Sequence, residues 1–199
     1  MPGALSFAPL TPDLLDDLGQ VLRGSWGRTC WCMYPRLTDA EMKALPGDGP
    51  VGMRRRAAMT SLAAKTPAPG LIAYMDKEPV GWIAFAQRDD LHRVARSRAT
   101  PAFDDVAAWV IPCVTVAKSA RGAGIAVALI EAAARYAFEN GAPAIEAYPR
   151  ARGDRVGDDS AFFGAEPMFE RAGFVKVRGP LANAPKNWPP RVVMRATPA

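Results

Sequence analysis

Six residues near the middle of the chain have the types and spacing of an anion-binding loop. They read Arg121-Gly122-Ala123-Gly124-Ile125-Ala126 and follow the apolar run Cys113–Val116. This order predicts a buried strand, a tight turn and a helix whose first backbone N–H groups face the turn. Gly122 and Gly124 carry no Cβ, so an anionic group can approach the backbone closely. The segment therefore predicts a pyrophosphate site at the start of a helix.

Two other phosphate-binding motifs fit the segment less well. A Walker loop needs Lys and then Ser or Thr directly after its last glycine, whereas Gly124 is followed by Ile125 and Ala126. A dinucleotide-binding fingerprint needs a third small residue, and Val127 stands at that position. The pattern that remains is Gln or Arg, two residues, Gly, one residue, and Gly or Ala.

This pattern resembles the acetyl-CoA motif of the GNAT superfamily of N-acetyltransferases. A second stretch, from Phe162 to Phe174, resembles that family's penultimate helix and its terminal Gly-Phe pair, and the order of elements matches from Leu5 to Arg195. The resemblance implies an acetyl-CoA-dependent enzyme whose fourth and fifth strands splay apart to admit the pantetheine arm of the cofactor. It assigns the pyrophosphate to Arg121, Gly122, Ala123, Gly124, Ile125 and Ala126, and the pantetheine to backbone groups of Val114 and Val116.

The proton-handling residues of the family are missing from their usual positions. Acetyl transfer needs a deprotonated amine, a polarised thioester carbonyl and a proton for the leaving thiolate. The tyrosine that many members use as the acid is replaced here by Phe169, and Val110 stands near the glutamate base of the histone-modifying branch. Ordered water is one substitute carrier. The side-chain candidates are Glu146 as a base, Tyr148 as a donor to the thiolate, and Asp105, with its neighbour Asp104, as an acid that attracts the amine.

The acceptor pocket is predicted from the family's geometry, in which the region between the first two helices borders it. That region is rich in aromatic residues and cysteine, and it predicts four substrate-binding residues, Trp26, Trp31, Cys32 and Tyr34. The stiff, proline-rich loop Gly179–Arg191 is predicted to cap the pocket. No metal site is predicted, because Cys30-Trp31-Cys32 lacks zinc-ligand spacing and His92 is the only histidine.

The elements that position these residues follow from hydrophobic periodicity and turn signals. Pro112 lies inside a predicted strand, where it removes a hydrogen-bond donor and predicts a bulge or bend. Predicted strands cover Leu5–Leu10, Leu71–Met75, Val80–Gln87, Ala107–Val116, Ala144–Tyr148, Phe174–Val177 and Val192–Arg195. Predicted helices cover Pro12–Leu22, Val51–Lys65, Gly122–Asn140 and Ser160–Ala172, and Arg88–Asp105 is predicted to be a polar loop.

The predicted fold is mixed α/β (α+β). By resemblance it is a GNAT fold: a mostly antiparallel mixed sheet of about six or seven strands, flanked by about four helices. The 199 residues suffice for a single domain. The absence of a leader pattern and of a disulfide framework predicts a cytoplasmic protein without a membrane partner. The formal net charge is +5 and the longest basic run is Arg54-Arg55-Arg56, which argues against nucleic acid as the main partner. A homodimer stays open.

The function predicted from the sequence is transfer of an acetyl group from acetyl-CoA directly to a primary amine of a small molecule. Two alternatives stay open. A CoA-binding sensor or partner domain without turnover is motivated by Phe169 and Val110. An acetyltransferase that acts on a protein or tRNA-linked amine is motivated by the basic net charge.

Overall fold

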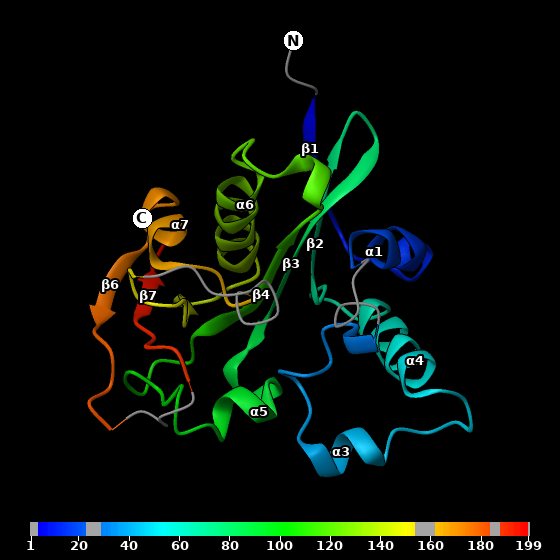
Figure 1. Ribbon diagram of the computed structural model, residues 1–199, viewed down its shortest axis with the longest axis horizontal. Coiled ribbons are helices and arrows are strands. Elements are labelled where there is room, and N and C mark those ends of the chain that lie inside the picture. The colour runs from blue at the N-terminus through cyan, green and yellow to red at the C-terminus, as the bar shows by residue number, and fades with distance from the viewer. Residues whose placement is uncertain (1–3, 23–28, 154–161, 184–187, 199) are drawn as a thin grey trace.

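The computed structural model describes residues 4–22, 29–153, 162–183 and 188–198. Its strands form one seven-stranded sheet in the order β1-β2-β3-β4-β5-β7-β6 (Figure 1). Among the described strands, β4 and β5 pair in parallel and every other neighbouring pair is antiparallel, as predicted. The bounds are β1 Leu5–Pro9, β2 Gly70–Met75, β3 Glu78–Gln87, β4 Trp109–Val116, β5 Ile145–Ala147, β6 Val175–Arg178 and β7 Val193–Ala196.

Helices cover both faces of this sheet (Figure 1). On one face α6 packs against Ile83 and Ile111, and on the other α1 and α4 pack against Trp82 and Cys113. Neighbouring residues such as Trp82 and Ile83 point to opposite faces because side chains alternate along a strand. The bounds are α1 Leu15–Val21, α3 Asp39–Lys43, α4 Val51–Ala63, α5 His92–Ala95, α6 Ile125–Glu139 and α7 Glu166–Arg171. No helix in the described ranges is long and apolar enough to cross a membrane.

Strand β4 contains the bulge that Pro112 predicts. Ala84 pairs with Cys113 and Ala86 pairs with Val110, so β4 carries one more residue than β3 across this interval. The pairing of β4 with β5 runs only from Trp109 to Ile111. Beyond Pro112 the two strands separate, which confirms the splayed pair, because proline has no N–H to continue a ladder.

Two expectations about the elements were wrong. The helix expected from Ser160, which lies outside the described residues, begins only at Glu166. Gly164 has a φ of +77° and Ala165 is extended, and neither conformation continues a helix. The polar loop expected between Arg88 and Asp105 contains α5.

Helix α3 was not predicted, although the sequence carries a signal for it. Thr38 accepts from the N–H of Glu41, and the Glu41 carboxylate accepts from the N–H of Thr38 at 2.7 Å. This is a capping box, which appears in sequence as Thr or Ser followed three residues later by Glu or Gln. Its importance is positional, because α3 forms part of the pocket described below.

Candidate active site

The predicted anion-binding loop has the geometry that its glycines allow. Gly122 and Gly124 have φ values of +85° and +78°, a region that glycine enters without penalty. Within the described part of the chain, the backbone N–H groups from Gly122 to Ala126 donate no hydrogen bond to another backbone group. A Cβ built on either glycine would meet nothing within 4 Å.

This open loop lies at the N-terminus of α6, a helix of 15 residues. Unpaired N–H groups and the positive end of a helix dipole favour a bound anion. The side chain of Arg121 fastens the loop to the sheet, since its Nε donates to the carbonyl of Val116 at 3.2 Å. The residues present therefore fit a pyrophosphate group, such as the one that coenzyme A carries.

The edge of β4 that faces the splay is in contact with another segment of the chain. The N–H of Val114 donates to the carbonyl of Phe162 at 2.8 Å. Gly164 fits closely between the side chains of Val114 and Phe169, since an added Cβ would lie 3.3 Å and 2.9 Å from them. A pantetheine arm that paired with Val114 and Val116 would thus replace the hydrogen bond that Val114 donates to Phe162 and the one that Val116 accepts from Arg121. The pantetheine role of the two valines stays a prediction.

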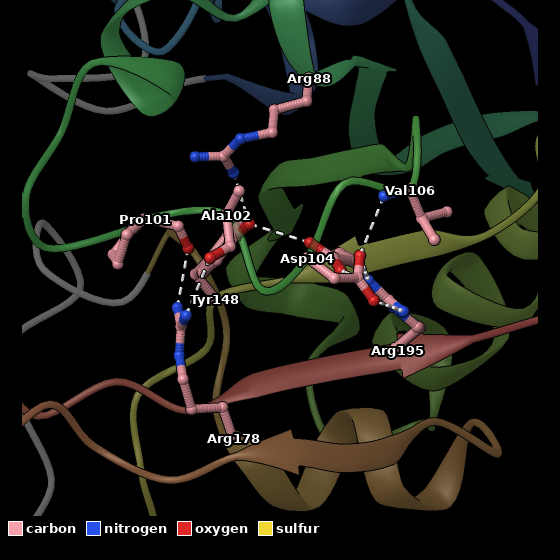
Figure 2. A network of polar contacts seen from close by, with 9 residues as sticks. Arg88, Pro101, Ala102, Asp104, Val106, Tyr148, Arg178 and Arg195 are labelled. Atoms are coloured by element: carbon pink, nitrogen blue, oxygen red, sulfur yellow. Dashed lines mark hydrogen bonds and ion pairs between the residues drawn. The ribbon is translucent and has the colours of Figure 1, made fainter.

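The proposed proton carriers Glu146 and Tyr148 lie together in a buried network. Figure 2 shows Tyr148 with its partner Arg88. The Tyr148 hydroxyl donates to Glu146 Oε2 at 2.9 Å and accepts a hydrogen bond from Arg88. The other carboxylate oxygen, Oε1, accepts from Nε of Arg195 at 2.9 Å. Both oxygens of Glu146 therefore have a partner inside the protein.

Burial, followed by the nearby negative charge of Glu146, raises the pKa of Tyr148. The phenol thus keeps its proton at neutral pH and directs it at Glu146. Tyr148 packs against Phe163 in a buried cluster, and its side chain has almost no exposed surface. Chemically the pair can hold a proton in a fixed place, and it can fix the elements around it.

The same network holds the loop that precedes β4 (Figure 2). Arg195 forms an ion pair with Asp104 at 2.6 Å, and this partner lowers the pKa of the Asp104 carboxyl. Arg178 donates to the carbonyls of Pro101 and Ala102 at 2.7 and 3.0 Å. The third predicted carrier, Asp105, belongs to this loop and is exposed to solvent.

A pocket of about 330 Å³ lies beside the loop that precedes β4. Its size is within the range of small-molecule sites. Segments far apart in the sequence build it, and its lining residues are Tyr34, Pro35, Thr38, Asp39, Arg93, Val94, Arg96, Ser97, Thr100, Phe163 and Trp188.

Of the four predicted substrate-binding residues, Tyr34 lines this pocket. Trp31 lies under the guanidinium of Arg56, 5.5 Å from its ring centroid, and does not line the pocket. Cys32 is buried, and its sulfur accepts from the indole N–H of Trp82 at 3.0 Å. Trp26 lies outside the described residues. The predicted cap Gly179–Arg191 does supply one lining residue, Trp188.

Sequence reasoning missed one wall of the pocket. Arg93 and its neighbour His92 hold this wall in place. The Arg93 guanidinium lies 4.1 Å from the Tyr34 ring centroid, and its Nε donates to the Tyr34 carbonyl at 2.8 Å. His92 contacts Glu41 at 2.6 Å and so joins α5 to α3. The length and polarity of the segment between Arg88 and Asp105 were the only sequence signal for this wall.

The pocket and the anion loop lie at opposite ends of β4. Gly81 pairs with Val116 next to the anion loop, whereas Gln87 pairs with Trp109, and α5 follows Gln87 closely. Phe163 lines the pocket, and the carbonyl of its neighbour Phe162 accepts a hydrogen bond from the N–H of Val114. The middle of β4 therefore lies between the place for a pyrophosphate and the place for a second substrate.

The residues at the family's usual acid and base positions belong to the core. Phe169 is fully buried and packs edge-on against Phe174, with ring centroids 5.4 Å apart. Val110 is fully buried too and lies opposite Glu146 in the parallel pair of strands. Neither side chain can exchange a proton.

Comparison with known proteins supports the family and the fold that the sequence predicts. The profile of the acetyltransferase (GNAT) family matches residues 34–174. A putative GNAT-family acetyltransferase from Desulfovibrio desulfuricans is similar with a TM-score of 0.56 and 15% identity, over 98% of this chain and 99% of that chain. An N-acetyltransferase from Staphylococcus aureus Mu50 gives 0.55 and 15%, over 98% of each chain.

The PaiA N-acetyltransferase from Thermoplasma acidophilum, solved in complex with coenzyme A, gives a TM-score of 0.54 and 12% identity, over 98% of this chain and 99% of that chain. At such identities the structural likeness shows the fold. A search among curated proteins finds no match. The family profile covers well over half of the sequence, including β4, the anion loop and α6. The chain therefore belongs to the GNAT family of acetyltransferases, enzymes that take their acetyl group from acetyl-CoA.

Proposed function

We propose that this enzyme transfers the acetyl group directly to a primary amine of a small molecule. The observation that carries the proposal is the pocket of about 330 Å³ at the end of β4 opposite the anion loop. An acetyl-CoA whose pyrophosphate occupies that loop has its thioester directed along β4 toward the pocket. An amine held in the pocket would then meet the thioester carbonyl, and such positioning supplies a large part of the rate enhancement in acyl transfer.

Direct transfer is supported by the state of the three cysteines, all of which are buried. Burial raises the pKa of Cys30 to about 11, which leaves it a poor nucleophile at neutral pH. Cys113, on β4 itself, points into the core beside α1 and α4. An acyl-cysteine intermediate therefore finds no support among these residues.

A small acceptor is supported by the aromatic side chains that enclose the pocket, Tyr34, Phe163 and Trp188. A tRNA acceptor would need free basic groups. The basic run on α4 is engaged elsewhere, because Arg55 donates to the carbonyl of Thr29 and Arg56 pairs with Asp16 at 2.7 Å.

For the proton steps we propose the same three side chains, Glu146, Tyr148 and Asp105, with ordered water as the alternative carrier. The test is a set of conservative variants, Glu146→Gln, Tyr148→Phe and Asp105→Asn. A proton carrier should lower kcat by about a hundredfold and change the pH–rate profile. A residue that only positions the pocket should raise the acceptor KM and leave that profile unchanged.

The experiment that tests the function is CoA release from acetyl-CoA across a panel of amines. The panel includes aminoglycosides, polyamines, amino acids, arylamines and a lysine peptide, with background from the protein thiols subtracted. Saturable release with one class of small amine is the expected result. Release with the lysine peptide alone would overturn the small-molecule acceptor.

A second candidate, a CoA-binding domain without turnover, is favoured by one observation. Both family proton positions hold fully buried, apolar side chains, Phe169 and Val110. Measured binding of acetyl-CoA without release on any amine of the panel would support this candidate against the first.

A further inference from the structure

The charges around the pocket are unbalanced toward the positive. Arg93, Arg96 and Asp39 are its charged lining residues in the described part of the chain. Asp39 is already paired with Arg93, with 2.7 Å between Oδ1 and the guanidinium nitrogen. Arg96 forms no ion pair or hydrogen bond through its side chain with any described residue. One positive charge at the pocket, that of Arg96, therefore has no partner among the residues that the structure describes.

A second cation without an acidic partner lies behind two of the pocket's aromatic walls. The Arg191 guanidinium is 4.3 Å from the centroid of the Phe163 ring and 5.5 Å from that of Trp188. It donates to the carbonyl of Tyr148 at 2.9 Å and pairs with no acid among the described residues. Burial, followed by the nearby Arg150, lowers its pKa to about 10, so the group is still charged at neutral pH.

These charges act on any acceptor that enters. An amine whose only charges are positive, such as a polyamine or an aminoglycoside, is repelled by Arg96 and Arg191. An acceptor with an anionic group forms a charge-assisted hydrogen bond with Arg96 instead, and arginine is suited to carboxylate and phosphate oxygens. The flat side chains of Tyr34, Phe163 and Trp188 favour an aromatic or apolar body between the amino group and the anionic group of the acceptor.

We propose that the acceptor is a zwitterionic amine, with a primary amino group, an aromatic or apolar body and an anionic group that Arg96 binds. An aromatic amino acid is the simplest member of this class. The inference rests on the proposed small-molecule function and makes it narrower. No pattern in the sequence indicated this class of acceptor, because Arg96 and Arg191 belong to distant segments that meet only in the folded chain.

The first experiment compares amines that differ only in the anionic group. Steady-state CoA release is measured with tryptophan and tryptamine, tyrosine and tyramine, and phenylalanine and phenethylamine, at the same pH and salt. We expect the amino acid of each pair to be acetylated with a kcat/KM about tenfold higher or more. The phosphonate analogue of phenylalanine shows whether Arg96 requires a carboxylate or accepts another anionic group.

The second experiment reverses the charge at the pocket. Arg96→Glu is compared with Arg98→Glu, a change two residues away on the same exposed turn, at a position that does not line the pocket. We expect Arg96→Glu to lower kcat/KM for tryptophan by about tenfold or more and to leave tryptamine unchanged or improved. Arg98→Glu should change the tryptophan-to-tryptamine ratio by less than about twofold.

The outcomes separate the two claims. If each decarboxylated amine is used as well as its amino acid, or if the two variants behave alike, the zwitterion inference is wrong and the small-molecule function stands. If no amine of the wider panel is acetylated, the proposed function is wrong and the inference falls with it. Isothermal calorimetry of tryptophan and tryptamine with the CoA-loaded protein gives an independent readout of the same preference.

Discussion

The proposed anion loop and the proposed acceptor pocket are built in opposite ways. The loop consists of six consecutive residues, and it offers backbone N–H groups and two glycines in the left-handed conformation. The pocket takes side chains from segments around Tyr34, Arg93, Phe163 and Trp188, and its wall is held by contacts across long sequence separations. Backbone groups at a helix start suit a constant ligand, whereas side chains on loops can vary with the acceptor.

The difference teaches where specificity lies in this enzyme. A change in the loop should affect every reaction of the protein, because the cofactor is shared by all of them. A change in the pocket should affect one acceptor more than another. At the same end of β4 as the pocket lies the buried network of Glu146, Tyr148 and Arg195, which connects β5 and β7 with the loop before β4.

The largest effect is expected from Gly124→Glu in the anion loop. The added carboxylate would lie where we propose that the pyrophosphate binds, so acetyl-CoA affinity should fall by roughly a thousandfold. The matched control is Gly141→Glu at the other end of α6. Gly141 has a similar φ of +81° and similar open space, so both variants carry the same backbone strain of about 1–2 kcal/mol. Calorimetry that finds equal acetyl-CoA affinity in the two variants would show that the site is misplaced.

The next effect is expected from Glu146→Gln in the buried network. The change leaves the buried end of Arg195 without its carboxylate and should lower the free energy of unfolding by about 3 kcal/mol. Asp104→Asn removes the more exposed acid from the same arginine and should cost much less. Chemical denaturation of both variants measures the difference. A small loss for Glu146→Gln would argue that this acid is kept for chemistry rather than for structure.

A smaller effect is expected from Trp188→Ala at the rim of the pocket. The indole is 37% exposed and forms one wall, so its removal should raise the acceptor KM by about tenfold. The affinity for acetyl-CoA should not change, because the anion loop lies at the far end of β4. Steady-state kinetics with the acceptor varied, together with a binding measurement for acetyl-CoA, checks both halves. Parallel losses in the two would contradict the separation of the sites.

The smallest effect concerns pH and the wall of the pocket. Hydrogen bonds from Thr38, with a lesser contribution from His92, lower the pKa of Glu41 to about 2. A carboxyl whose pKa is lowered on folding stabilises the protein above its unfolded value, near 4.5, and this stabilisation is lost as the pH falls toward 2. Glu41→Gln should therefore reduce the decline in stability between pH 4.5 and 2. Thermal unfolding curves that decline equally in both proteins over this range would exclude the effect.

Much of the fold was predictable from local pattern. The hairpin of β2 and β3, the long helix α6 and the bulge at Pro112 each depend on neighbouring residues, such as an apolar period or a missing N–H. The errors came where a local signal was overridden or overlooked. Gly164 and the extended Ala165 place the start of α7 later than expected. The capping box at Thr38 marks α3, a helix that was not expected.

The residues of the candidate site also differ in how far the sequence alone could predict their surroundings. Gly122 and Gly124 determine a loop conformation that needs no distant residue, so the sequence alone predicted the shape of the loop, and its role as an anion site stays a prediction. Glu146 and Tyr148 were selected for their strand, yet only the structure shows that both are buried and that Arg195 and Arg88 bind them. For Trp31 and Cys32, the aromatic and cysteine-rich pattern did not reveal that they lie away from the pocket.

The sequence by itself thus determined the family, the glycine loop at the start of α6 and the order of the strands, because these depend on residue types at fixed short spacing. Only the tertiary structure decided which side chains form the pocket and which charges there lack a partner within the described ranges. The physical reason is that an ion pair or an aromatic contact depends on distance in space, and Tyr34, Arg96 and Arg191 are far apart along the chain. Their meeting depends on the packing of α3, α5 and the segment before β7 around the sheet.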